Sequence, residues 1–121
     1  MVRSVAAVVI VLVAGLHIYF LVLEMFLWQR PLGRRTFGST PEFAQSTAKL
    51  AANQGLYNGF LAAGLLWALF AYGVISGRPI ITFFLACVVV AGVFGAVTVN
   101  RRILLVQAVP ATIATALLWL A

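Results

Sequence analysis

The sequence predicts an all-α integral membrane protein: one membrane domain over residues 1–121, folded as an antiparallel, up-down four-helix transmembrane bundle. Of its 121 residues, 64% are hydrophobic and only 8% are charged, whereas a soluble domain carries about 25% charged residues. Four long apolar runs account for nearly the whole chain, and each approaches the roughly 20 residues that cross a bilayer. The alternating patterns of about ten residues that indicate barrel strands are missing, so the runs are expected to be helices.

The four helices are expected at about residues 4–28, 41–75, 79–100 and 103–121. The first run follows Arg3 as a secretory signal would, but it continues unbroken to Trp28 without a polar region behind a cleavage site. It is therefore interpreted as a permanent helix. Tight turns at residues 76–79 and 100–102 make consecutive helices antiparallel neighbours.

The longest connection is a predicted cytoplasmic loop at about residues 29–40. One proline and two glycines disfavour a continuous helix there. Thr40, Pro41 and Glu42 then form a pattern typical of a helix start: a hydroxyl cap, a proline at the first helical position and an acid in the first turn. The second helix is expected to begin at this point, in the cytoplasm.

The net charge of +6 is distributed unevenly along the chain. Six of the eight basic residues flank the first and third connections, and only Arg3 and Arg78 lie at the opposite helix ends. This asymmetry predicts a multi-pass protein of the bacterial cytoplasmic membrane with both termini outside. The lipid bilayer is the expected partner, through anionic headgroups as well as acyl chains, and nucleic-acid binding is not expected. The six residues are Arg30, Arg34, Arg35, Lys49, Arg101 and Arg102.

Small residues recur at four-residue spacing on two of the helices, which favours close approach of helix backbones in lipid. Packing within one bundle is the preferred interpretation, and a homo-oligomer face is the alternative. Pro110 frees a backbone carbonyl in the fourth run and predicts a kink. The two ladders comprise Ala51, Gly55, Gly59 and Ala63 on the second helix, and Gly92 with Ala96 beside Ala91 with Gly95 on the third.

No cofactor or metal site is expected. The single cysteine, Cys87, is interpreted as a packing residue, and no zinc, iron–sulfur or c-type haem spacing occurs in the chain. Ligation of haem by His17 would rest on that residue alone.

Two titratable groups lie inside the first helix, where polar groups are costly. His17 and Glu24 are seven residues apart, so they point the same way, on a stripe shared with Ile10, Val13 and Phe20. Counted from Trp28 as the interface, Glu24 lies about 6 Å inside the cytoplasmic boundary and His17 about 10 Å deeper. The stripe is expected to face the interior of the bundle.

Polar residues of the other helices are expected at a similar depth. We interpret them with Glu24 and His17 as one cluster that binds a ligand or exchanges a proton, with Asn53, Gln54 and Asn58 as direct participants. The alternative is that the cluster only joins the helices by hydrogen bonds. The supporting residues are Tyr57, Thr98 and Gln107.

Four stretches of the chain, HIYFLVLEMFLW, NQGLYNGFLAAGL, GVFGAVT and QAVPA, resemble a family of small bacterial four-helix membrane proteins, the domain of unknown function numbered 1304. The resemblance covers essentially the whole chain, and NQGLYNG is its most specific part. It implies the four-helix topology and the association of His17, Glu24, Asn53, Gln54 and Asn58. It implies no substrate or reaction.

Three functions remain as alternatives. The first is binding of a small lipophilic or polar molecule or its proton-coupled transport, since small multidrug exporters are similar in size, helix count and a first-helix carboxylate. The second is an accessory or structural membrane subunit. The third is an intramembrane enzyme, for example an isomerase with Glu24 and His17 as acid and base, although nucleophile and dinucleotide motifs are missing.

Overall fold

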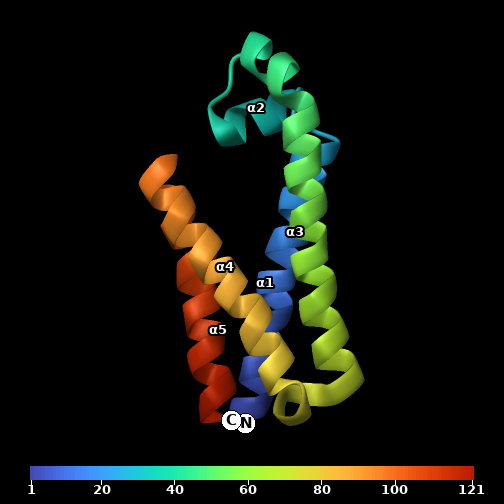
Figure 1. Cartoon of the computed structure of the whole chain (residues 1–121), viewed down its shortest axis with the longest axis vertical. Helices are drawn as coiled ribbons and strands as arrows, with labels where there is room; N and C mark the ends of the chain where they lie inside the picture. Colours follow the sequence, from blue (N-terminus) through green and yellow to red (C-terminus); the bar gives the residue numbers. More distant parts are fainter. The chain divides into compact units, whose positions relative to one another are not determined.

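The computed structural model describes residues 1–121 and is helical throughout, with no strand, so the all-α prediction is confirmed (Figure 1). Its elements are α1 (Val2–Met25), α2 (Pro31–Phe37), α3 (Pro41–Ser76), α4 (Arg78–Thr98), the π-helix η1 (Leu104–Ala108) and α5 (Val109–Leu120).

Three of these helices, α1, α3 and α4, are long and apolar enough to cross a membrane. The expected fourth span is divided between η1 and α5 and forms a shorter apolar segment, Leu104–Leu120. The π-turn has a local cause: Pro110 lacks an N–H, and its ring would clash with the carbonyl four residues earlier. The helix widens there, so that the Val109 N–H bonds to the Leu104 carbonyl. The predicted irregularity at this proline is thus present as a π-turn before it.

The chain forms two compact units, Met1–Gly15 with Leu61–Ala121, and Leu16–Phe60. The core of the first unit is apolar and draws on α1, α3, α4 and α5. Its largest fully buried side chains include Ile10, Leu65, Ile81, Leu85 and Leu118.

Within this first unit, α4 and α5 run antiparallel. Near one end, the Trp119 indole donates to the Thr82 hydroxyl at 3.1 Å, and the Arg78 guanidinium lies 5.0 Å from the centre of the Trp119 ring. Near the other end, a Cβ added to Gly92 would lie 2.8 Å from the backbone nitrogen of Ala108. The absence of a side chain at Gly92 therefore lets α4 and the end of η1 touch through their backbones. This part of the α4 ladder packs within the chain, as preferred from the sequence.

The second unit contains the end of α1, the whole of α2 and the beginning of α3. The prediction of a loop at residues 29–40 is wrong in one respect: within this connection, Pro31–Phe37 forms the short helix α2. Pro31 favours the first helical turn, and Gly38 ends the helix in the left-handed conformation with φ 65°. Proline and glycine here mark the limits of a short helix, so they do not exclude one.

The start of α3 has the predicted cap, since the Phe43 N–H donates to the Thr40 hydroxyl at 3.1 Å. Near its other end α3 is interrupted at Gly73, whose φ of 83° and ψ of 177° are not helical. This conformation is strained for residues with a Cβ, and it was not predicted.

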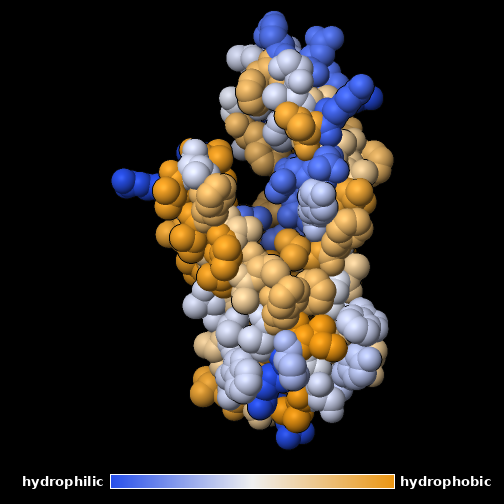
Figure 2. All heavy atoms as spheres, viewed as in Figure 1, coloured by the Kyte–Doolittle hydropathy of each residue, from blue (hydrophilic) through white to orange (hydrophobic).

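Hydrophobic side chains cover much of the face of the molecule in Figure 2, while hydrophilic ones gather over α2 and the beginning of α3. Large side chains such as Phe70, Phe83, Phe94 and Leu105 are at least 63% exposed. Such exposure of contiguous apolar helix surface suits contact with lipid.

Candidate functional site

The buried stripe of α1 contains His17 and Glu24. Ile10, Val13 and His17 are at most 1% exposed, and Glu24 is 9% exposed. Along the helix, these four residues are separated by three, four and seven positions. This is the period at which one face of a helix packs against neighbours. Four of the five residues of the predicted stripe are therefore buried, and the fifth, Phe20, is half-buried.

The buried stripe of α3 follows the same period. Ala51, Gly55, Asn58, Ala62 and Leu65 are buried, each three or four residues after the one before. Asn58 is the polar member of this series and is 5% exposed.

Small residues of α3 bring the two helices into close contact within the second unit. A Cβ added to Gly55 would lie 2.8 Å from Cγ of Met25 and 3.0 Å from Cβ of Glu24. One added to Gly59 would lie 2.6 Å from Cδ1 of Leu21. Both are closer than real Cβ contacts, so the glycines define how near α1 and α3 approach each other beside Glu24.

At this close approach, the Asn58 side-chain amide donates a hydrogen bond from Nδ2 to Oε1 of Glu24 at 2.5 Å. Glu24 is therefore hydrogen-bonded to Asn58, one of the residues expected to form a cluster with it. Because both side chains are buried, little water competes for these atoms, and each partner depends on the other for satisfaction.

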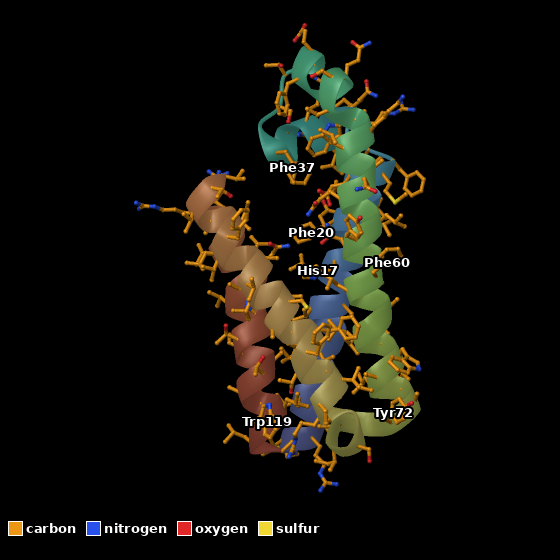
Figure 3. The ribbon with its side chains drawn as sticks, in the orientation of Figure 1. His17, Phe20, Phe37, Phe60, Tyr72 and Trp119 are labelled. Atoms are coloured by element: carbon orange, nitrogen blue, oxygen red, sulfur yellow. The ribbon has the colours of Figure 1, made fainter.

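His17 is fully buried two turns before Glu24 on α1. Its ring meets Phe20 edge-on, with 5.5 Å between the ring centroids and an interplanar angle of 76°. Figure 3 shows these two rings on the same side of α1. The imidazole therefore packs against one aromatic ring of its own helix.

The other polar residues of the NQGLYNG segment are not brought into this buried contact. Asn53, Gln54 and Tyr57 are exposed, and Tyr57 packs edge-on against Phe60 at 5.9 Å. On a helix, Gln54 lies at the edge of the buried stripe that contains Asn58, while Asn53 and Tyr57 lie outside it. Of the four polar residues in this segment that were expected to belong to one cluster, only Asn58 is buried at the contact between α1 and α3.

Thr98 and Gln107 belong to the other compact unit. The Thr98 hydroxyl is exposed and donates to the Phe94 carbonyl of its own helix at 2.7 Å, and Gln107 is half-buried.

Sequence reasoning missed residues that position the Glu24–Asn58 pair. Leu21 packs beside Gly59, and the Trp28 indole donates to the Thr47 hydroxyl at 3.1 Å, which ties the end of α1 to the beginning of α3. Trp28 also packs against Phe37 of α2, with 4.9 Å between ring centroids. The glycine ladder was the one signal that could have identified the α1–α3 contact in advance.

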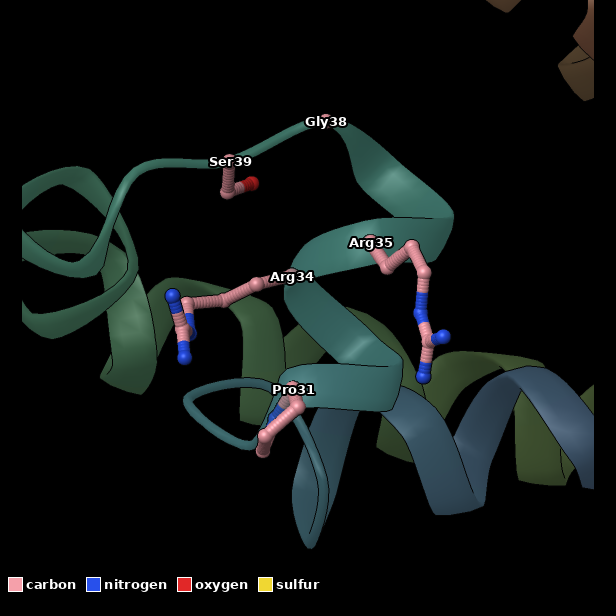
Figure 4. Close-up of a pocket in the computed structure, with 5 residues that line it drawn as sticks. All are labelled: Pro31, Arg34, Arg35, Gly38 and Ser39. Carbon is pink, nitrogen blue, oxygen red and sulfur yellow. The ribbon is translucent and has the colours of Figure 1, made fainter.

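Two surface hollows accompany this arrangement, and neither is lined by Glu24. One lies over α2, lined by Pro31, Arg34, Arg35, Gly38 and Ser39 (Figure 4). The other is an apolar groove on α4, lined by Phe83, Ala86, Cys87, Val90, Ala91 and Phe94. No three His, Cys, Asp or Glu side chains gather to hold a metal ion.

These features define a small helical protein with three helices able to span a membrane and a buried carboxylate–amide pair between two of them. The chain belongs to the family described as protein of unknown function (DUF1304), whose model matches residues 11–119. It is 31% identical over 98 residues to uncharacterized protein YpaA of Lactococcus lactis subsp. lactis (strain IL1403), covering 79% of this chain and 81% of that protein. No solved structure matches it.

Replacing Asn58 should show how strongly the two buried groups depend on each other. Asn58→Leu leaves the Glu24 carboxyl buried without its donor, so we expect a loss of about 1–3 kcal/mol in the free energy of unfolding. The matched control is Asn53→Leu, which removes an exposed amide five residues earlier on α3 and should change stability by less than about 0.5 kcal/mol. Thermal unfolding in detergent, followed by helical circular dichroism, measures both. Equal effects of the two variants would mean that the Glu24–Asn58 bond is not an important contact.

Proposed function

We propose that the protein spans the bacterial cytoplasmic membrane as a four-helix antiparallel bundle, in which Glu24 exchanges a proton during the binding or transport of a small molecule. The apolar length of α1, α3 and α4 supports insertion. The segment Leu104–Leu120 is about 25 Å long at 1.5 Å per residue, near the lower limit for a span. A bacterial relative supports the location.

The buried Glu24–Asn58 hydrogen bond carries the proposal. A carboxyl at membrane depth is costly, while hydrogen bonds between membrane helices contribute only about 0.6 kcal/mol on average. Two amides would join α1 and α3 equally well. A carboxyl adds a group that can lose and regain a proton, and this capacity is the reason we propose for its presence.

Asn58 is suited to both protonation states of Glu24. Its NH₂ group donates to a carboxylate oxygen, and its carbonyl oxygen can accept from the O–H of the protonated acid after the amide turns. Asn58 can thus remain hydrogen-bonded to Glu24 when the proton leaves and when it returns. In a transport cycle, release of the proton would make Glu24 an anionic partner for a cationic or strongly polar ligand.

The remaining polar residues take secondary roles in this proposal. His17, buried two turns deeper on the same face of α1, would pass the proton further into the membrane. The exposed amides of Asn53 and Gln54 would contact polar parts of the ligand. Tyr57, Thr98 and Gln107 would support these contacts.

An accessory membrane subunit is the second candidate, and one observation favours it. Asn58 already supplies a donor to the buried Glu24 carboxyl, as a structural pair requires. In that case the pair would define the register of α1 against α3, as a buried polar residue does in coiled coils.

The proposed topology places both termini outside the cytoplasm, because six of eight basic residues flank the other two connections. A phosphatase fused after Ala121, which is active only outside the cytoplasm, should be active, whereas the same enzyme inserted after Gly38 should be inactive. The reverse pattern would contradict the topology.

Proton exchange is tested in proteoliposomes that enclose a pH-sensitive dye and carry a proton gradient, to which a panel of small lipophilic cations is added. We expect at least one cation to induce proton flux with the wild-type protein. Glu24→Gln, which retains shape and hydrogen bonding, should reduce this flux to that of empty vesicles.

Glu42→Gln is the matched control, since it neutralises the other acidic side chain, which is exposed at the start of α3. It should leave the flux unchanged. Flux that persists in Glu24→Gln, or that no member of the panel induces, would favour the accessory role.

A further inference from the structure

The hollow over α2 lies in a strongly basic part of the second unit. Between Arg30 and Lys49 the chain carries four basic residues and one acid, Glu42. Two of the basic residues, Arg34 and Arg35, line the hollow together with Pro31, Gly38 and Ser39 (Figure 4). The hollow measures about 440 Å³, and its electrostatic character suits an anion.

The two arginines differ in their exposure and in their hydrogen bonds. Arg34 is half-buried, and its guanidinium is held by one hydrogen bond from Nε to the Gln29 carbonyl at 3.2 Å. Its terminal nitrogens remain for another acceptor. Arg35 is exposed, and Figure 4 shows its side chain on the other side of Pro31 from that of Arg34. Guanidinium groups recognise phosphate oxygens by paired hydrogen bonds.

The backbone that carries these side chains is held in place by packing and hydrogen bonds. Gly33 packs directly on the Leu27 carbonyl, where a Cβ would not fit. After α2, the N–H groups of Gly38 and Ser39 both return to the Arg34 carbonyl. The Trp28 ring links α2 to α3 through Phe37 and Thr47. The two guanidinium groups therefore extend from a helix, α2, whose backbone is held by these contacts.

We propose that this α2 hollow binds the phosphate of an anionic phospholipid headgroup, with Arg34 and Arg35 as its ligands and the Ser39 hydroxyl as an additional donor. Along the chain, α2 connects the end of α1 to the start of α3, where helices that span a membrane would reach the headgroup layer. A lipid phosphate is held at that level by its acyl chains, whereas a free phosphate must be captured from water. This inference rests on the proposed insertion of α1 and α3, and it is independent of any role of Glu24.

Spin-labelled lipids in phosphatidylcholine vesicles containing the full-length protein test the site. The fraction of label immobilised by the protein is compared for phosphatidylglycerol and phosphatidylcholine probes. We expect a several-fold preference for phosphatidylglycerol in the wild type. Arg34→Gln/Arg35→Gln should remove most of it, because this variant lacks the guanidinium donors that would hold the headgroup phosphate.

Arg101→Gln/Arg102→Gln is the matched control, since it removes the same charge from another exposed, adjacent arginine pair. It should retain the preference. Arg34→Lys/Arg35→Lys keeps the charge but not the paired donors, so its preference should lie between the wild type and the glutamine variant. Inorganic phosphate at constant ionic strength should not displace the lipid.

Each contrary outcome has a distinct meaning. Equal losses in the two glutamine variants, or full retention in the lysine variant, would indicate diffuse charge and overturn the site. Displacement by inorganic phosphate would indicate a free anion as the ligand and overturn the lipid assignment. The absence of any immobilised phosphatidylcholine would show that the protein is not inserted, which is a failure of the proposed function and is recognised separately from a lost preference.

Discussion

Close backbone contact between α1 and α3 is the constraint on which the polar centre of this protein depends. Gly55 and Gly59 have no side chains to separate the helices, so Leu21, Glu24 and Met25 pack directly against α3. At that separation the short Asn58 side chain reaches the Glu24 carboxyl. A larger residue at Gly55 would press on Glu24 and on the Leu21 carbonyl, whereas one at Gly59 would first meet the end of the Leu21 side chain. The small-residue ladder and the polar pair are therefore two parts of one arrangement, in which packing brings a costly group to its partner.

Much of this arrangement could be predicted from hydrophobic periodicity. The burial of Ile10, Val13, His17 and Glu24 on one face of α1 follows directly from their spacing, because the cost of exposing polar groups to lipid orients the helix. The Thr40 helix cap could likewise be predicted from the sequence, because it involves only residues close together in the chain. Asn58 was one of several candidate partners. To select Asn58 over Asn53, Gln54 and Tyr57, one must know how α3 is rotated about its own axis. A four-residue spacing leaves that rotation undetermined by tens of degrees.

Features that depend on local backbone chemistry were harder to predict. Pro31 and Gly38 are helix-breaking in general, but they also begin and end the short helix α2. Gly73 interrupts α3 within an apolar run that gives no sign of it. At Pro110 the irregularity takes the form of a widened turn, η1. At α2 and η1 the prolines and glycines indicated an irregular backbone, while its form was decided by hydrogen bonds that composition does not specify.

The central claim is that Glu24 is a proton-exchanging group in the membrane, and infrared spectroscopy tests it directly. The chain has only two acidic side chains, so Glu42→Gln leaves Glu24 as the single one. In lipid vesicles, the carbonyl stretch of a protonated carboxylic acid should appear and disappear reversibly with pH, shift in frequency in Asn58→Leu, and be absent in Glu24→Gln. A carboxyl that remains in one protonation state throughout the pH range in which the protein is folded would contradict the account.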